Sequence, residues 1–478
     1  MKLMKLPLGF FDSKNTGDLL QRIGDHKRIE SFLTRSTLSI LLSFTNILVF
    51  GMVLAIYSLP IFLTFLSAAI LYIFWILIFL KKRKEIDYKA FQDLSNNQDA
   101  LIEIIQGMSE IKLQGSQQKR RWAWARIQAK LFHTQMKSLA ISQYQDAGAL
   151  SINQLKDILI TFLAATYVLN GQITLGTMLA IQYIIGQLNG PLQQLVGFIR
   201  TAQDAIISLE RLSEIHGVNN EELLGENKMD IIPEGDIYIE NLSFRYTPIS
   251  DDVLQDVNII IPRGKITAIV GTSGSGKTTL IKLLLGFYKA TKGKIIIGNA
   301  PLNSIYQKIW RKQCGVVMQE GYIFSDTIAN NIAESGENTN YAKVIDAANV
   351  ANIFDFIHTL PLGLNSMIGA KGNGISLGQK QRLLIARAVY KNPQFLFFDE
   401  ATNALDANNE KIIMKNLDEF LKGRTAIVVA HRLSTVKNAD QIIVLDNGKV
   451  IEVGTHKELI QNKGSYYSLV SNQLELAK

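Results

Sequence analysis

The chain has 478 residues, of which 47% are hydrophobic and 19% are charged, and its net charge is +8 at pH 7. This length predicts two or three domains, and the single cysteine, Cys314, excludes an internal disulfide. Lysine and arginine cluster beside apolar segments, as at 81–84 and 119–121, which favours the cytoplasmic flank of a membrane over a nucleic-acid groove. We therefore expect membrane lipid, and no nucleic acid, among the partners.

Two long segments in the first 200 residues, 36–80 and 158–199, contain no charged residue. A membrane span takes roughly 20 residues, so each segment is long enough for two spans. Pro60 and the turn at 170–172 divide them. The sequence thus predicts a partial transmembrane domain at 1–216 with spans at about 37–56, 61–80, 158–170 and 175–199 and cytoplasmic helices at 85–156.

The distribution of charge predicts the topology. Neither short hairpin contains lysine or arginine, so the positive-inside rule places both termini and the 81–156 connection in the cytoplasm. The last predicted span carries polar residues that are costly against lipid. They are expected either to face a pore or partner helices, or to hydrogen-bond between helices without a substrate role. These residues are Gln182, Gln187, Asn189, Gln193 and Gln194.

After a linker at 217–233, a second domain is predicted at 234–474, with a helical subdomain at about 325–390. Its apolar run 266–270 is typical of a buried strand and leads directly into a G-x-x-x-x-G-K-T sequence and a helical pattern. Glycines let such a loop wrap closely, so that backbone N–H groups and the helix N-terminus point at phosphate. The predicted ATP contacts in this segment are Gly271, Thr272, Ser273, Gly274, Ser275, Gly276, Lys277, Thr278 and Thr279.

Two side chains of the loop and two acids further along the chain predict the chemistry. Lys277 is expected to reach the β- and γ-phosphates, and the Thr278 hydroxyl to ligate Mg²⁺. A second apolar strand, 395–398, ends in Asp399 and Glu400. A carboxylate at the end of a strand is well placed to hold Mg²⁺, and an adjacent one can polarise the attacking water. We therefore assign Asp399 to the metal and Glu400 to the general base.

Together these motifs resemble an ATP-binding cassette (ABC) transporter, because the sequence I-S-L-G-Q at 375–379 is similar to the signature L-S-G-G-Q of that family. In the family, two cassettes meet head to tail, and ATP lies between the phosphate loop of one and the signature of the other. The resemblance therefore implies a second half-transporter chain, identical or different. The signature residues are Ser376, Leu377, Gly378 and Gln379, and Leu377 stands where the family usually has glycine.

The resemblance also implies roles for single residues. Tyr246 matches the aromatic residue that stacks on adenine, although a core tyrosine is the alternative. Gln319 matches the glutamine that contacts Mg²⁺ and water, and Asp406 lies in the D-loop that crosses the dimer. His431 matches the switch histidine near the γ-phosphate. Ala370 replaces a glutamate expected before the signature, which puts mechanical coupling in doubt.

The N-terminal half resembles the exporter type of membrane domain, with 10–18 similar to the cytoplasmic loop before the third span and 103–115 similar to the loop that docks on the partner cassette. The subgroup it resembles is that of peptidase-containing bacteriocin and peptide exporters. Compared with that pattern, the peptidase domain and the first two spans are missing, which indicates a fragment or a split gene.

The expected fold class is a helical transmembrane domain joined to an α/β phosphate-loop cassette. The predicted function is ATP-driven, Mg²⁺-dependent export of a peptide-like or other amphipathic substrate. The protein would be a multi-pass protein of the inner or plasma membrane with its cassette in the cytoplasm. The alternative is a truncated or regulatory subunit that binds ATP but does not transport on its own.

Overall fold

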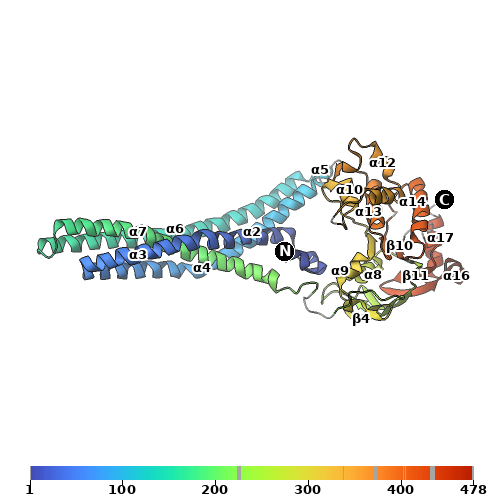
Figure 1. Cartoon of the computed structure of the whole chain (residues 1–478), viewed down its shortest axis with the longest axis horizontal. Coiled ribbons are helices and arrows are strands. Elements are labelled where there is room, and N and C mark those ends of the chain that lie inside the picture. The colour runs from blue at the N-terminus through green and yellow to red at the C-terminus, as the bar shows by residue number, and fades with distance from the viewer. Residues whose placement is uncertain are drawn as a thin grey trace. The chain divides into compact units, whose positions relative to one another are not determined.

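The computed structural model describes residues 2–222, 228–336, 338–369, 374–401, 403, 405–430 and 436–475. The chain divides into two compact units (Figure 1). The first consists of Met1–Leu6 and Phe10–Asn219, and the second of Pro7–Gly9 and Asn220–Lys478. Each unit has its own buried hydrophobic clusters, so each is a separate packing unit.

The first unit is built from long helices. In chain order the elements are η1 (Leu3–Lys5), α1 (Leu8–Asp12), α2 (Thr16–Ser31), the π-helical turn η2 (Phe32–Ser36), α3 (Thr37–Tyr57), α4 (Leu59–Gln106), α5 (Met108–Leu113), α6 (Gln117–Leu169) and α7 (Leu175–Gly217). Ser58 has an extended backbone and Pro60 stands in the first turn of α4, so the helix breaks there and reverses. The helices α4 and α6 pack along each other, as do α3 and α7 (Figure 1).

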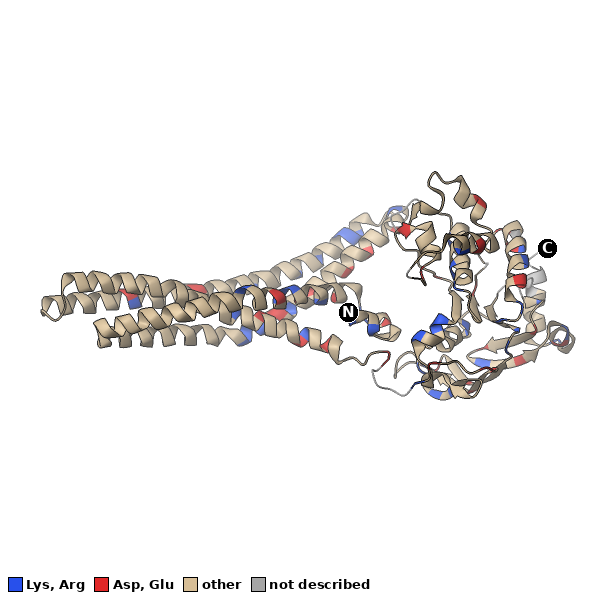
Figure 2. Ribbon diagram, viewed as in Figure 1, with Lys and Arg blue, Asp and Glu red and all other residues tan. Residues whose placement is uncertain are grey.

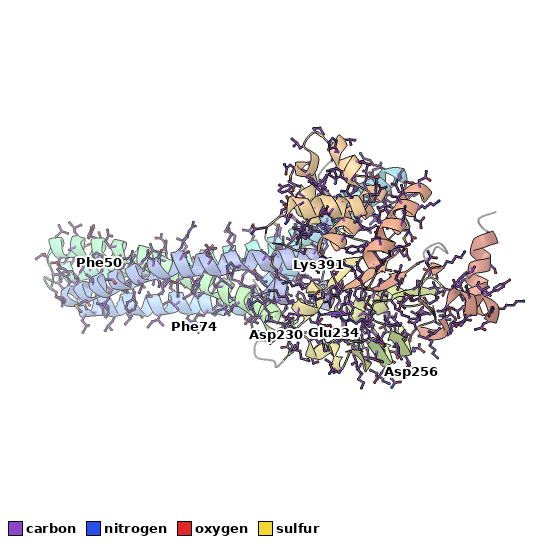
Figure 3. The ribbon with its side chains drawn as sticks, turned by 45° about the vertical axis from the view of Figure 1, so that its right-hand side comes forward. Phe50, Phe74, Asp230, Glu234, Asp256 and Lys391 are labelled. Carbon is purple, nitrogen blue, oxygen red and sulfur yellow. The ribbon has the colours of Figure 1, made fainter. Side chains whose placement is uncertain are left out.

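The apolar part of this unit has a buried core and an apolar exterior. Leu54, Ile61, Ile160 and Ile181 are fully buried where α3, α4, α6 and α7 meet. Phe74, in contrast, projects outward from α4 and is 61% exposed (Figure 3). Figure 2 shows few charged residues along this part of the helices. An apolar exterior without charge is the surface that a bilayer requires.

Within the described part of the chain, three helical runs are long and apolar enough to cross a membrane: Thr16–Tyr57, Leu59–Gln106 and Gln117–Leu169. The helix α7 is not among them, because its polar side chains lower its hydropathy, and the total of four spans stays a prediction. Two of those polar residues hydrogen-bond within the unit: Asn189 accepts from Lys156, and Gln194 accepts from Ser43. For these two, the interpretation as interhelical hydrogen bonding fits the contacts.

The second unit is an α/β domain around a six-stranded sheet with the strand order β12-β11-β3-β10-β9-β6. All neighbouring strands in it are parallel except β11 and β12. An antiparallel sheet, β2-β1-β4-β5, and a small pair, β7-β8, complete the strands in the described residues. The strands are β1 (Ile237–Phe244), β2 (Leu254–Ile261), β3 (Ile266–Gly271), β4 (Lys292–Ile297), β5 (Ala300–Pro301), β6 (Cys314–Val317), β7 (Asp326–Thr327), β8 (Met367–Ile368), β9 (Phe395–Asp399), β10 (Thr425–Val429), β11 (Gln441–Asp446) and β12 (Lys449–Gly454).

Helices cover the sheet and fill the loops between strands. They are α8 (Lys277–Leu284), η3 (Leu302–Ser304), α9 (Gln307–Lys312), α10 (Ile328–Ile332), α11 (Tyr341–Val350), α12 (Phe354–Thr359), η4 (Gly363–Asn365), α13 (Leu377–Tyr390), α14 (Ala407–Leu421), α16 (His456–Asn462) and α17 (Ser465–Glu475). The central strands β3, β9 and β10 are mostly apolar because both faces of the sheet are covered. Along β9, Phe395 and Phe397 enter one buried cluster, while Leu396 and Phe398 enter the other. The sheet thus separates two cores, and its carboxyl edge is left for the loops that follow β3, β9 and β6.

Candidate nucleotide-binding site

The loop between β3 and α8 has a backbone that only glycine can adopt at two positions. Gly271 has φ +155°, and a Cβ there would lie 2.0 Å from the carbonyl oxygen of Leu445. Gly276 caps α8 with φ +100°, and its Cβ would lie 2.7 Å from Cδ2 of Leu254. The loop is therefore pressed against β11 and β2 and turns directly into the N-terminus of α8, the arrangement that presents backbone amides to an anion.

The Lys277 side chain folds back over this loop. Its Nζ donates hydrogen bonds to the carbonyl oxygens of Gly271 (3.0 Å) and Thr272 (2.8 Å). Burial lowers the pKa of Lys277, and the nearby Glu400 and Asp399 carboxylates oppose that shift. The Lys277 ammonium, held by two backbone carbonyls and lying near two carboxylates, provides the positive charge that binds a phosphate chain.

Asp399 ends β9 at the same edge and has unused acceptor capacity. Asp399 is 1% exposed, and neither of its carboxylate oxygens accepts a normal hydrogen bond from the described residues. Burial raises the pKa of Asp399. The nearby Thr278 hydroxyl opposes this rise, although it does not form a hydrogen bond of normal geometry with the carboxylate. Buried carboxylate oxygens without partners are costly. Together with a hydroxyl, they form the hard oxygen donor set that suits Mg²⁺.

Glu400 follows Asp399 and is held on both its backbone and its side chain. It has φ +52°, a left-handed backbone that is strained for a residue with a Cβ. Its carboxylate oxygen Oε2 accepts hydrogen bonds from Gln319 Nε2 (2.9 Å) and Asn403 Nδ2 (2.7 Å). Its carbonyl oxygen accepts one from Gln381 Nε2 at 2.9 Å. The adjacent ends of β6 and β9 thus bring the side chains of Gln319 and Glu400 together.

Tyr246 follows β1 and is 44% exposed. Its hydroxyl is hydrogen-bonded to the Thr279 hydroxyl at 3.0 Å, which ties the ring to the first turn of α8. The Tyr288 ring packs edge-to-face against it at a centroid distance of 5.3 Å. The ring is therefore fixed beside the phosphate loop with part of its surface open, so it is not a fully buried core tyrosine.

The signature forms the start of α13. Ser376 caps the helix, accepting from the Gln379 backbone N–H (3.2 Å), while the Gln379 side chain accepts from the Ser376 N–H (2.7 Å). This is a complete capping box. Leu377 is 69% exposed, so its side chain points into solvent from the first turn. Within the described residues, no hydrogen bond joins this segment to the phosphate loop of the same chain.

The remaining predicted residues have the following places. Asp406 caps α14 by accepting from the Asn409 backbone N–H at 2.9 Å. Thr272 donates to Asp446 at 3.2 Å. Ser275 Oγ is buried and has no partner among the described groups. Gly378 lies in the first turn of α13, while Ser273 and Gly274 form the exposed tip of the loop. His431 and Ala370 lie outside the described residues.

Two contacts of the site escaped the sequence prediction. Gln381 holds the Glu400 carbonyl, and Asp446 holds Thr272. Gln381 is the fifth residue of α13 and shares the buried face of that helix with Leu384 and Ala388, so a glutamine at helical spacing from apolar residues was the available signal. Asp446 is the last residue of β11, the strand beside β3, and only the strand order reveals that Asp446 and Thr272 lie together.

The loop, the buried lysine and the two acids at the edge of a parallel sheet define a phosphate-loop nucleotide site in a chain that also carries membrane-length helices. The ABC transporter family matches residues 254–403, and the ABC transporter transmembrane region matches residues 1–192. The chain therefore belongs to the ABC transporter family. It is an exporter half-transporter with an ATPase cassette, a multi-pass protein of the inner membrane.

Individual relatives agree with this assignment. The chain is 35% identical over 475 residues to the leukotoxin translocation ATP-binding protein LktB of Mannheimia glucosida, covering 99% of this chain and 67% of that protein. It is 35% identical over 469 residues to the alpha-hemolysin translocation ATP-binding protein HlyB of Escherichia coli O157:H7, covering 98% and 66%. A bacterial Atm1-family ABC exporter with ATP bound superposes with a TM-score of 0.91 at 27% identity, covering 99% and 83%.

Proposed function

We propose that this half-transporter hydrolyses Mg²⁺-ATP in a head-to-tail dimer and uses the cycle to export a polypeptide. The observation that supports a polypeptide cargo is the similarity to leukotoxin and alpha-hemolysin translocation proteins, which extends over both units at 35% identity. A similarity confined to the cassette would support only ATP hydrolysis. The matched share of 99% of this chain includes the helices that a cargo must pass.

The residues of the site divide the chemistry among them. Lys277 and the loop amides bind the β- and γ-phosphates, and Tyr246 stacks on the adenine. Thr278, Gln319 and Asp399 would hold Mg²⁺, which neutralises phosphate charge when bound. Glu400 accepts a proton from the attacking water, and its bonds from Gln319 and Asn403 fix the orientation of its carboxylate. His431 is assigned to the γ-phosphate on the resemblance alone.

The proposed head-to-tail dimer is supported by the signature segment, which makes no hydrogen bond to the phosphate loop of its own chain within the described residues. Ser376 is the exposed N-cap of α13 and Gln379 lies half-buried in its first turn, and the N-terminal dipole end of this helix favours an anion. In a head-to-tail dimer this helix start would face the nucleotide bound by the other copy. ATP then bridges two subunits, and its binding shifts the pair toward the closed state by its differential affinity for that state.

The general base is tested with Glu400→Gln in the full chain. The substitution keeps the shape and the hydrogen bonds of the side chain but removes its basicity, so ATP binding should persist while turnover falls about 10²- to 10⁴-fold. Glu320→Gln is the matched control, because Glu320 is an exposed neighbour of Gln319. Normal turnover in Glu400→Gln would remove Glu400 as the base.

The cargo is tested in inverted membrane vesicles that contain the chain. An amphipathic, labelled peptide should accumulate inside the vesicles with ATP and stay outside with Glu400→Gln. A small amphipathic dye of equal charge serves as the comparison substrate. Transport of the dye without transport of any peptide would contradict a polypeptide cargo and leave the ATPase assignment intact.

A further inference from the structure

A large cavity lies between α4 and α6, in the helical unit. Its volume is about 1110 Å³, and all of its lining residues belong to these two helices. The helices are fastened on either side of it. Trp75 Nε1 donates to the Gln145 carbonyl at 3.1 Å, and Thr134 donates to the Asp93 carboxylate at 2.7 Å. The cavity is thus an open groove between two helices that are hydrogen-bonded to each other at both of its ends.

One end of the cavity is apolar and aromatic. Trp75 and Phe79 pack edge-to-face with their ring centroids 5.2 Å apart. Gly148 faces them from α6, and a Cβ on it would lie 2.4 Å from the indole, so the ring rests on bare backbone. Tyr144 completes this end. Such a surface accepts hydrocarbon and offers few polar groups.

The other end is cationic. It is lined by four lysines and two carboxylates, which gives a net charge of +2 with His133 neutral: Lys82, Lys89, Lys130, Lys137, Glu85 and Asp93. Lys130 pairs with Asp93 at 3.0 Å. Lys82 and Lys137 form no ion pair within the described residues, so both ammonium groups are available to an anion. The cavity is thus apolar at one end and positively charged at the other.

The order of the two ends matches the direction of the membrane. Trp75 and Phe79 belong to the apolar run that ends at residue 80, and the basic run 81–84 follows at once. Aromatic residues at the end of a span and lysines just beyond it mark the cytoplasmic interface. Basic pockets between transmembrane helices on that side suit anionic lipid headgroups. Because many of its lining side chains are exposed, a lipid can reach the groove without separating the two helices.

We propose that this cavity binds one anionic phospholipid of the cytoplasmic leaflet, with an acyl chain against Trp75 and Phe79 and the phosphate between Lys82 and Lys137. The site lies in the helical unit and does not depend on which cargo is exported. An acidic segment of a protein would satisfy the lysines, but it would not place an extended hydrocarbon chain against the aromatic end.

The test uses the full chain in mixed micelles of phosphatidylglycerol and phosphatidylcholine with identical acyl chains, and native mass spectrometry to measure the ratio of the two bound lipids. Wild type should retain phosphatidylglycerol in preference. One lysine near an anionic headgroup changes affinity about fivefold, so Lys82→Gln with Lys137→Gln should lower the ratio about 25-fold. Lys27→Gln with Lys81→Gln is the control, because it removes the same charge from exposed lysines outside the cavity.

A cavity-filling variant separates the acyl contribution from the charge. Ala147→Phe should lower retention of both lipids and leave their ratio unchanged. Equal retention of the two lipids by wild type, or the same loss in the control pair, would overturn the proposal. Occupation by a second copy is detected with Lys137→Cys, since Cys314 is buried and gives no background labelling. If the introduced cysteine of this variant crosslinks two copies of the chain in a sample that retains no lipid, lipid is refuted as the occupant.

Discussion

Two glycines of the phosphate loop provide a matched pair for testing why the loop has its shape. Gly274 has φ +82° and Gly276 has φ +100°, so alanine at either position meets a left-handed backbone that costs about 1–2 kcal/mol. A Cβ on Gly274 has nothing within 4 Å. A Cβ on Gly276 lies 2.7 Å from Leu254 Cδ2 and 3.1 Å from the Val253 oxygen, which adds about 1–3 kcal/mol of overpacking.

Hydrogen exchange of the amides in 266–270, measured in the full chain without nucleotide, reports the local stability of β3 beside the loop. Since 1.4 kcal/mol is tenfold, Gly274→Ala should speed exchange about 5- to 30-fold and Gly276→Ala by more than about 30-fold. The absence of nucleotide keeps ligand contacts out of the comparison. Equal exchange rates in the two variants would refute the packing of Gly276 against Leu254 as the cause.

Three further predictions concern the rest of the molecule. Arg211→Met should cost about 3–5 kcal/mol of stability in thermal unfolding, because the buried Asp25 carboxylate loses the guanidinium that pairs with it at 2.8 Å and keeps only the neutral Ser208 hydroxyl at that distance. Arg120→Met, at an exposed pair, should change nothing measurable. Because burial raises the pKa of Asp399, its ionisation opposes folding at pH values above that pKa. Asp399→Asn should therefore stabilise the nucleotide-free protein at neutral pH, and urea unfolding should show this gain shrinking as the pH falls toward 3.8. Leu377→Gly restores the usual signature residue. Because the leucine side chain is exposed, ATP turnover should stay within about twofold of wild type, and the helix should lose about 0.5–1 kcal/mol of stability. A tenfold rise in turnover would show that Leu377 obstructs the nucleotide.

The phosphate loop could be predicted because its chemistry lies in consecutive residues. A buried strand, three glycines with positive φ and a helix starting at Lys277 are all local features, and no distant contact is needed to recognise them. The placing of Asp399 and Glu400 also required only that an apolar strand end there. The resemblance to the ABC family then supplied the roles of residues that local patterns leave open, such as Gln319.

Contacts between distant helices could not be predicted in the same way. Arg211 on α7 pairs with Asp25 on α2 (2.8 Å) and with Asp87 on α4 (3.0 Å), and its guanidinium lies over the Phe91 ring. In the sequence these are ordinary charges on amphipathic helices, where a solvated face is the usual interpretation. Only the packing of three helices shows that Arg211 is 2% exposed and depends on both acids.

The contacts of the catalytic side chains determine how ATP must bind. Lys277 donates to two carbonyls of its own loop, and the Glu400 carboxylate is held by Gln319 and Asn403. The Lys277 ammonium has three donors and uses two of them on its own loop, so one is left for a phosphate oxygen, and each further phosphate contact must replace a carbonyl and gains only the difference between the two hydrogen bonds. The bonds to Glu400 need not break, because a carboxylate has further lone pairs for water. If Lys277 contacts both the β- and γ-phosphates, binding should therefore move the lysine off a carbonyl while the general base stays in place, which makes the loop, and not the acid, the part of the site that responds to ATP.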